Sequence, residues 1–142
     1  MIAAGAWAAA EPVLGRAFGT PYSDVRLLGR LVTRGGVWPV AGVALHLANG
    51  AVFGWGFERI GLSGTKQGVL AAEIENLVLW PGFIIVDRIH PDRREGRWPR
   101  LLTNRRVATY EVAAHALFGI VLGGLVRRSA ALPRPVGQPG RA

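Results

Sequence analysis

The chain has 142 residues, half of them hydrophobic, and a mean hydropathy of +0.26, which suits a single domain and lies above the usual range of soluble proteins. Its formal charge of +8 comes almost entirely from arginines that flank apolar segments and do not alternate with aromatic residues, which argues against a nucleic-acid-binding protein. Because the chain has no cysteine, disulfides, thiolate nucleophiles and cysteine-based metal sites are excluded.

Four segments contain few charges and have about the length that crosses a bilayer. They predict four transmembrane helices, at about residues 1–18, 37–57, 68–86 and 107–126. We therefore expect an all-α, polytopic membrane protein with one domain over residues 1–128. The first segment lacks the basic start of a signal peptide, so it is expected to be a retained helix. Residues 129–142 contain three prolines and are expected to be disordered.

Two basic connectors separate the predicted helices. Residues 16–34 and 87–106 hold 4 and 7 lysines or arginines, against 2 in residues 58–66 and 4 after residue 126. By the positive-inside rule, both connectors are expected on the cytoplasmic side. Arginine recurs at every fourth position in the first connector, which predicts a short amphipathic helix at the membrane surface over residues 27–32.

The sequence aligns with itself at an offset of 69 residues without a gap. The offset pairs prolines, histidines and glycines: Pro12 with Pro81, His46 with His115, Gly50 with Gly119, and Gly54 with Gly123. Internal repeats are common in polytopic membrane proteins. We therefore interpret the chain as two tandem helical hairpins, which are expected to be parallel because two crossings separate equivalent helices.

Each histidine of these pairs begins a His-x-x-x-Gly-x-x-x-Gly motif. Residues four apart share a helix face, so each motif forms a stripe along its helix. In lipid, small residues let helix backbones approach closely and make dispersion contacts. We expect five glycines of the two stripes to be helix-packing positions: Gly42, Gly50, Gly54, Gly119 and Gly123.

The two histidines lie at similar depths. His46 and His115 are roughly 12 to 14 Å along their helices at the usual rise per residue, near the membrane midplane. We therefore expect them to face each other or a shared centre. An alternative is that each imidazole only links neighbouring helices by a hydrogen bond, with Asn49 or Glu111 as its partner.

The third segment contains two carboxylates and an amide, Glu73, Glu75 and Asn76. A carboxylate at the centre of a transmembrane helix costs roughly 2.5 to 3.5 kcal/mol, so this helix depends on its neighbours. We expect Glu73 and Asn76, three residues apart, to point inward, and Glu75 to point to another partner or to the outer interface. Together with Glu11, Glu111 and the histidines, these acids form a ladder of ionisable groups at staggered depths.

Intramembrane ionisable groups favour a functional hypothesis. The best one is a small helical bundle that supports passage of protons or of a small solute. The alternative is a non-catalytic membrane scaffold or partner subunit, whose buried polar residues only specify assembly. The candidate polar core or ion path consists of His46, Asn49, Glu73, Asn76, Glu111 and His115.

Two further alternatives concern bound groups. A pair of midplane histidines can ligate a haem iron, but the sequence offers no second pair. Glu111, His115, His46 and Glu73 are donor types for iron or zinc, but Glu-x-x-x-His differs from the Glu-x-x-His spacing of bundle di-iron sites. We therefore predict no cofactor and no metal. The sequence also lacks the common catalytic motifs, so no enzyme activity and no catalytic residue is predicted.

The order of elements is an opening helix with a proline, a His-x-x-x-Gly-x-x-x-Gly helix, a proline-broken third helix and a second such motif. Over residues 5–128 this layout resembles small bacterial inner-membrane proteins of unknown function that have four crossings. The resemblance implies a multi-pass location in the bacterial cytoplasmic membrane and no particular activity. We expect the lipid bilayer as a partner, with a second copy of the chain or a larger membrane complex as alternatives, and no nucleic acid.

Overall fold

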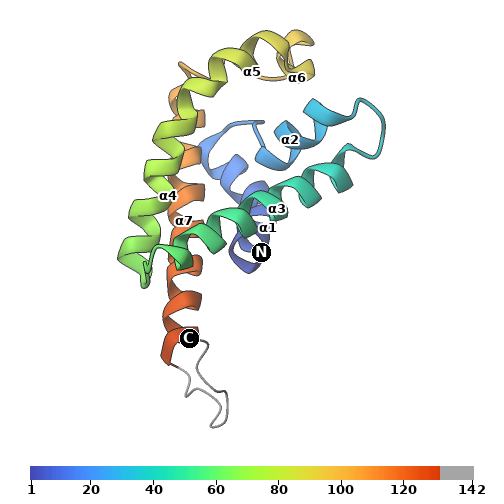
Figure 1. Cartoon of the computed structure of the whole chain (residues 1–142). Helices are drawn as coiled ribbons and strands as arrows, with labels where there is room; N and C mark the ends of the chain where they lie inside the picture. The colour runs from blue at the N-terminus through green and yellow to red at the C-terminus, as the bar shows by residue number, and fades with distance from the viewer. Residues whose placement is uncertain (132–142) are drawn as a thin grey trace.

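The computed structural model describes residues 1–131, and all regular secondary structure in this part is helical (Figure 1). The elements are α1 (Ile2–Phe18), α2 (Asp24–Val32), α3 (Trp38–Arg59), α4 (Thr65–Leu79), the 3-10 turn η1 (Trp80–Gly82), α5 (Phe83–Ile89), α6 (Pro91–Arg94) and α7 (Arg105–Ala131). The all-α class is thus confirmed. The expected disorder from residue 129 is corrected, because 129–131 continue α7; residues 132–142 lie outside the described part.

Three helical segments are long and apolar enough to cross a membrane: Trp38–Arg59, Thr65–Ile89 and Arg105–Ala130. They contain the predicted segments 37–57, 68–86 and 107–126 almost completely. α1 coincides with the first predicted segment but has only 17 residues and is not among the three. Three membrane-length helices are therefore established, and the fourth crossing is not.

The span Thr65–Ile89 is one continuous helical segment that contains a short 3-10 turn. Pro81 has no N–H to donate, so the α-helical pattern tightens into η1 and resumes as α5. In Figure 1, α4 lies beside α7, α5 continues from the end of α4 toward α6, and α3 crosses at a slant. The contact between α4 and α7 is the most extensive between helices of the described chain.

Glycines make the contact between α4 and α7 possible. A Cβ on Gly119 would lie 2.5 Å from the carbonyl oxygen of Gly68, and a Cβ on Gly123 would lie closer still to the carbonyl oxygen of Gly64. The backbone N–H of Gly64 donates a hydrogen bond to the carbonyl of Gly123 at 3.0 Å. The two helices therefore meet backbone to backbone, as small residues allow in a membrane.

The glycine stripe of α3 has different partners. Gly42 faces the backbone of α2 at Val25, Gly50 faces Ala4 of α1, and Gly54 contacts the side chain of Leu122 in α7. The stripe of α7 packs mainly on one helix, whereas that of α3 packs on three. These contacts do not confirm two equivalent hairpins.

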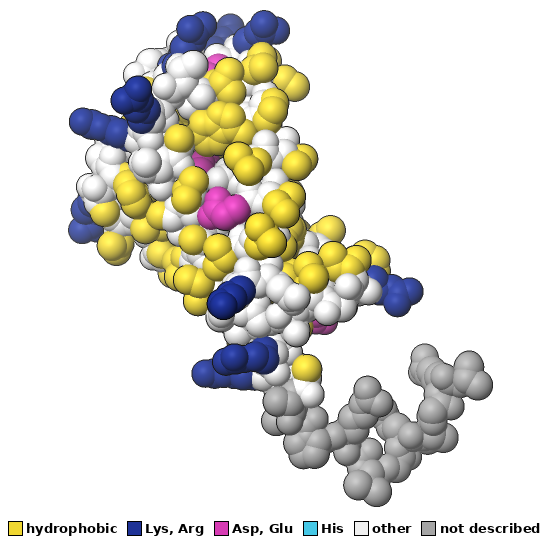
Figure 2. Space-filling model, turned by 90° about the vertical axis from the view of Figure 1, so that its left-hand side faces the viewer, with side chains coloured by type: hydrophobic (Ala, Val, Ile, Leu, Met, Phe, Trp, Pro, Cys, Tyr) yellow, Lys and Arg dark blue, Asp and Glu magenta, His cyan; other side chains and the backbone are white. Residues whose placement is uncertain are grey.

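Exposed side chains are largely apolar on α3, α4 and α5. Among the most exposed are Val40, Val52, Trp55, Leu70, Leu77, Val78 and Ile85. Figure 2 shows one such face, where hydrophobic side chains form a broad area with lysines and arginines above and below it in the view and an acidic side chain within it. An apolar band bounded by basic groups is the surface expected of a membrane protein.

The two basic connectors lie at the same end of the molecule and interlock. Arg26 of the first connector binds Asp92 of the second through two hydrogen bonds, from Nε at 2.8 Å and from a terminal nitrogen at 2.9 Å. Arg97 also pairs with this fully buried carboxylate. The indole N–H of Trp98 donates to the carbonyl of Pro21 at 3.0 Å. The connectors thus lie on one side, as the arginine distribution predicts, and the amphipathic helix expected between residues 27 and 32 is α2.

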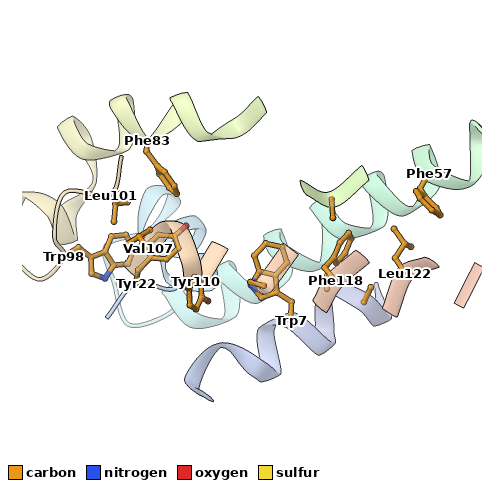
Figure 3. Packing of buried hydrophobic residues seen from close by; sticks show 14 residues of the cluster. Trp7, Tyr22, Phe57, Phe83, Trp98, Leu101, Val107, Tyr110, Phe118 and Leu122 are labelled. Carbon is orange, nitrogen blue, oxygen red and sulfur yellow. The ribbon is translucent and has the colours of Figure 1, made fainter. Parts of the chain in front are cut away.

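The buried hydrophobic residues form an elongated core (Figure 3). Tyr22, Trp98 and Tyr110 gather at the connector end, while Phe118 lies toward the opposite end. Trp7 of α1 stands between the two groups. Polar side chains collect beside this tryptophan, where the core is not filled.

Candidate polar site in the membrane region

A cavity of about 220 Å³ lies between α1, α2, α3, α4, α5 and α7. One part of its wall is apolar and aromatic, including Leu79, Trp80 and Phe83. The rest is polar and comprises Asp24, His46, Asn49, Glu75, Asn76, Glu111 and His115. No lysine or arginine is among the residues that line it, all of which belong to the described part of the chain. Three carboxylates therefore share this space with imidazoles, amides, a tyrosine hydroxyl and an indole, and with no cationic lysine or arginine of the described chain.

The cavity brings together five of the six predicted polar residues, namely His46, Asn49, Asn76, Glu111 and His115. The sixth, Glu73, lies outside it in a surface hollow with Lys66 and Ile120, where it accepts a long hydrogen bond from Asn76 at 3.4 Å. Glu75, which was expected to point away, lines the cavity instead.

This exchange of the two glutamates has a geometric cause. The buried stripe of α4 is Gly68, Ala72 and Asn76, spaced four residues apart. Glu73 and Glu75 flank this stripe on opposite sides, so only one of them can face the cavity. The contact with α7 along the stripe, which the spacing of acids alone does not reveal, selects Glu75.

The two histidines do not contact each other, because Trp7 stands between them. Its indole lies 4.9 Å from the His46 ring and 4.5 Å from the His115 ring, centroid to centroid, in edge-on geometry. Nδ1 of His115 is 2.9 Å from the backbone oxygen of Glu111 and 3.4 Å from a carboxylate oxygen of the same residue. The expected shared centre therefore exists, and an indole occupies it.

Several polar atoms at the cavity have no partner within the described chain. They are Nε2 of His46, Nε1 of Trp7 and Oδ2 of Asp24, and each residue is less than a tenth exposed. A buried polar atom without a hydrogen bond costs about 1 to 3 kcal/mol. Water or a polar ligand in the cavity would satisfy these atoms.

At the connector end, the polar wall is extended by two residues that sequence reasoning missed, Tyr22 and Asp24. Tyr22 donates its hydroxyl hydrogen to Asp24 at 2.8 Å. The carboxylate of Glu11 accepts the backbone N–H groups of Asp24 at 2.8 Å and of Val25 at 3.1 Å, and so caps α2. Burial, together with the nearby carboxylates of Glu111 and Glu11, raises the pKa of Asp24 well above its ordinary value.

Asp24 and Tyr22 lie in a connector, outside the apolar segments in which the polar groups of the membrane core were expected. The only local signal is Ser23, whose hydroxyl accepts the N–H of Arg26 at 3.1 Å and caps α2. That signal predicts the start of a helix and not a contact with the membrane core.

Toward the opposite end the polar wall gives way to aromatic side chains. Phe53 and Phe118 pack edge to face with centroids 5.5 Å apart, and Phe118 lies 6.1 Å from Trp7. Leu122 continues the apolar packing beyond them. We refer to Phe53 and Phe118 as the aromatic plug.

The geometry disfavours both bound groups considered from the sequence. Within residues 1–131, no three His, Asp or Glu side chains are close enough to hold a metal ion, so Glu111, His115, His46 and Glu73 do not form a metal site. Trp7 fills the space between the two imidazoles that a haem with two histidine ligands would occupy.

No family model, curated protein or solved structure matches the chain. The inference of function therefore depends on the physical chemistry of this cavity.

Proposed function

We propose that the chain is a multi-pass protein of the bacterial cytoplasmic membrane that carries protons, or a small cationic solute, across the bilayer through its polar cavity. The observation that carries this proposal is the grouping of Asp24, Glu75 and Glu111 with two histidines around one cavity that has no lysine or arginine in its wall. Such groups are costly inside a membrane and are characteristic of proton and ion pathways.

The membrane arrangement that we propose includes α1 as a fourth crossing. α1 packs on α7 and α3 and buries Ala3, Ala4 and Trp7. Its apolar residues Ile2 and Val13 remain exposed. With both basic connectors at the cytoplasmic side, each end of the domain would face the other side. The common contact of His46 and His115 with Trp7 favours a duplicated origin, although the surrounding helix contacts have diverged.

Proton movement would begin at the connector end. Burial raises the pKa of Asp24 well above its ordinary value, so this carboxyl binds a proton more readily than an exposed aspartate does, and Glu111 lies near enough to contribute to that shift. From Glu111 the next group is His115, at 3.4 Å, followed across Trp7 by His46 and, on the cavity wall, by Glu75. Carboxylates and imidazoles are the side chains that most readily accept and release protons near neutral pH.

Water would connect these groups. At about 30 Å³ per molecule, a cavity of about 220 Å³ has room for several waters, and the unpartnered atoms of His46, Trp7 and Asp24 supply polar contacts for them. The aromatic plug separates this hydrated region from the far side. Passage then requires the plug to move, which makes it the gate of the proposed path.

The test is proton flux into proteoliposomes that contain a pH-sensitive dye, driven by a potassium diffusion potential. The wild-type protein should exceed empty vesicles, and Glu111→Gln or His115→Gln should lower the flux by about tenfold or more. Glu73→Gln is the matched control, because this glutamate lies outside the cavity, and its flux should stay near the wild-type value. Equal flux in wild-type and empty vesicles, for protons and for a small amine alike, would refute the proposal.

The scaffold alternative is supported by one observation, the hydrogen bonds by which buried Glu11 caps α2, since they give an acid of this region a structural role. It predicts that Glu111→Gln and His115→Gln reduce thermal stability in detergent while no variant changes proton flux. The two functions are therefore separated by measuring flux and stability on the same variants.

A further inference from the structure

A second cavity, of about 460 Å³, lies at the connector end, outside the membrane core. It is lined by Arg30, Arg34, Ile89, Pro91, Arg94 and Glu95. Three arginines against one glutamate give this cavity a net positive charge. Its residues come from both connectors and from the end of the membrane span Thr65–Ile89.

The arginines of this cavity differ in what they already bind. Arg30 pairs with Glu95 at 3.5 Å and lies 3.8 Å from Asp92, so its position is held. Arg34 and Arg94 have no ion-pair partner within residues 1–131, and both are exposed. Asp92 does not neutralise them, because its two oxygens are bound by Arg26 and Arg97. Two guanidinium groups thus remain available at a site that a third arginine orders.

We propose that this cavity binds a phosphate group, and that the phosphate belongs to the headgroup of an anionic phospholipid. Guanidinium groups bind phosphate oxygens in pairs of parallel hydrogen bonds, which favours arginine at such sites. Basic pockets at the cytoplasmic ends of membrane helices are typical places for anionic headgroups. The proposal is independent of the proton cavity, because the two cavities have no lining residue in common.

The position of the cavity favours a lipid over a soluble phosphate. Ile89, 56% exposed, belongs both to the cavity wall and to the apolar surface of α5, which continues to Ile85, 61% exposed. On the first connector, Leu31 and Val32 are also exposed beside the arginines. A lipid whose phosphate lies among the arginines could therefore place its acyl chains on α5 without leaving the bilayer.

Such a lipid would connect the two connectors. Arg34 follows α2, and Arg94 ends α6, so one phosphate held by both would add to the link that Asp92 makes between these elements. The lipid would then stabilise the packing of α2 against α6. The consequence can be measured as thermal stability.

The experiment compares the unfolding temperature of the detergent-purified protein with phosphatidylglycerol, with phosphatidylcholine and with inorganic phosphate, and counts bound lipids by native mass spectrometry. Phosphatidylglycerol should raise the unfolding temperature and remain bound, whereas phosphatidylcholine should not. The double variant Arg34→Gln/Arg94→Gln should weaken phosphatidylglycerol binding roughly thirtyfold, since each arginine near a membrane surface contributes roughly fivefold.

The matched control is Arg127→Gln/Arg128→Gln, which removes the same charge at the opposite end of α7 and should leave binding unchanged. If inorganic phosphate reproduces the effect and only the cavity variant abolishes it, the phosphate site is supported and the lipid source is overturned. Equal stabilisation by phosphatidylcholine, or equal loss in both double variants, would overturn the site. If the double variant does not fold, Arg34→Gln alone takes its place in the experiment. This change should not disturb folding, because Arg34 forms no ion pair with a carboxylate of the described chain.

Discussion

The indole of Trp98 lies flat against the imidazole of His90: the two rings are 5° from parallel and their centroids are 4.5 Å apart. Both side chains are buried. Nδ1 of His90 accepts the N–H of Asp92 at 3.2 Å, and Nε2 lies 3.3 Å from the carbonyl of Leu27. This arrangement requires a neutral ring with its proton on Nε2, and it joins the second connector to α2.

The first prediction is that His90 makes the stability of the connectors depend on pH. Burial lowers the pKa of His90 below its ordinary value, although Leu27 and Asp92 act in the opposite direction and Arg30 and Arg26 add to the lowering. The folded pKa of His90 is below the unfolded value of about 6.5. The stabilisation that neutral His90 gives to the fold is therefore fully present above that pH and is lost as pH falls through the folded pKa. The unfolding temperature of the wild type should therefore fall from about pH 7.5 to about pH 5.5.

His90→Gln is the variant that isolates this effect. It should be less stable than the wild type at neutral pH, because the stacking on Trp98 is lost, but its own stability should vary less over the same pH range. Scanning fluorimetry in detergent at several pH values measures both. A variant with the full wild-type pH dependence would assign the effect to His46, His115 or another group.

The second prediction concerns Asp92. Burial alone would raise the pKa of Asp92, but hydrogen bonds from Arg26 and Arg97 outweigh it and lower the pKa below its ordinary value. Its stabilising effect is thus present above about pH 4 and is lost only in stronger acid. Asp92→Asn removes the buried charge that Arg26 and Arg97 share and should cost about 2 kcal/mol, less than the loss of a fully buried pair, because Arg26 and Arg97 are 30% and 38% exposed.

The control for Asp92 is Glu95→Gln. Its side chain is 48% exposed, so its ion pairs with Arg30 and Arg97 are screened by solvent, and the change should cost well under about 1 kcal/mol. Thermal unfolding of the two variants at neutral pH makes the comparison. Equal losses of stability in the two variants would mean that the burial of Asp92 adds nothing to the stability that its ion pairs provide.

Much of the fold could be predicted because the hydropathy of a segment indicates whether it favours water or an apolar environment. The segments 37–57, 68–86 and 107–126 correspond to helical segments of the structure, and His46 and His115 lie within two of them as predicted. Arginine distribution also predicts that the two connectors lie together. These properties are local, so neighbouring residues determine them.

What could not be predicted depends on contacts between distant segments. Whether Glu73 or Glu75 faces the cavity is decided by the face of α4 that meets α7, and the choice differs by two residues in sequence. Asp24 becomes part of the site only because α2 folds back against the membrane helices. The pairing of Arg26 with Asp92 joins positions 66 residues apart. No pattern within either segment indicates these outcomes.

The third prediction concerns the contact between α4 and α7. Gly119→Ala would place a methyl group 2.5 Å from the carbonyl oxygen and 2.6 Å from the carbonyl carbon of Gly68, so the helices would have to separate. Overpacking of this kind typically costs about 1 to 3 kcal/mol. Gly56→Ala in α3 is the control, because its new methyl group would meet open space, and it should stabilise slightly through helix propensity. If Gly119→Ala is as stable as Gly56→Ala, the backbone contact is not a determinant of the fold.

The fourth prediction is that Asp24→Asn stabilises the protein while impairing its proposed function. A carboxylate whose folded pKa is raised destabilises the fold as pH rises above its unfolded value of about 4. Asparagine keeps an oxygen for the Tyr22 hydroxyl but has no charge to bury, so stability near about pH 8 should increase on the order of 1 kcal/mol. The gain should disappear below about pH 3, where aspartate is protonated in both the folded and the unfolded state. A loss of stability at the higher pH would show that Asp24 is ionised and well compensated.

The fifth prediction concerns the aromatic plug. Phe53 is only partly buried, so Phe53→Ala removes one half of its pair with Phe118 at less cost to the core than truncation of Phe118 itself. If the plug limits passage, proton flux in proteoliposomes should rise several-fold, and addition of Glu111→Gln should return it to the level of that single variant. Val52→Ala, on the neighbouring side chain that is 68% exposed, is the control and should leave flux unchanged. A folded Phe53→Ala protein with wild-type flux would place the barrier elsewhere, whereas increased flux that survives Glu111→Gln would indicate a nonspecific leak and not a path through the carboxylates.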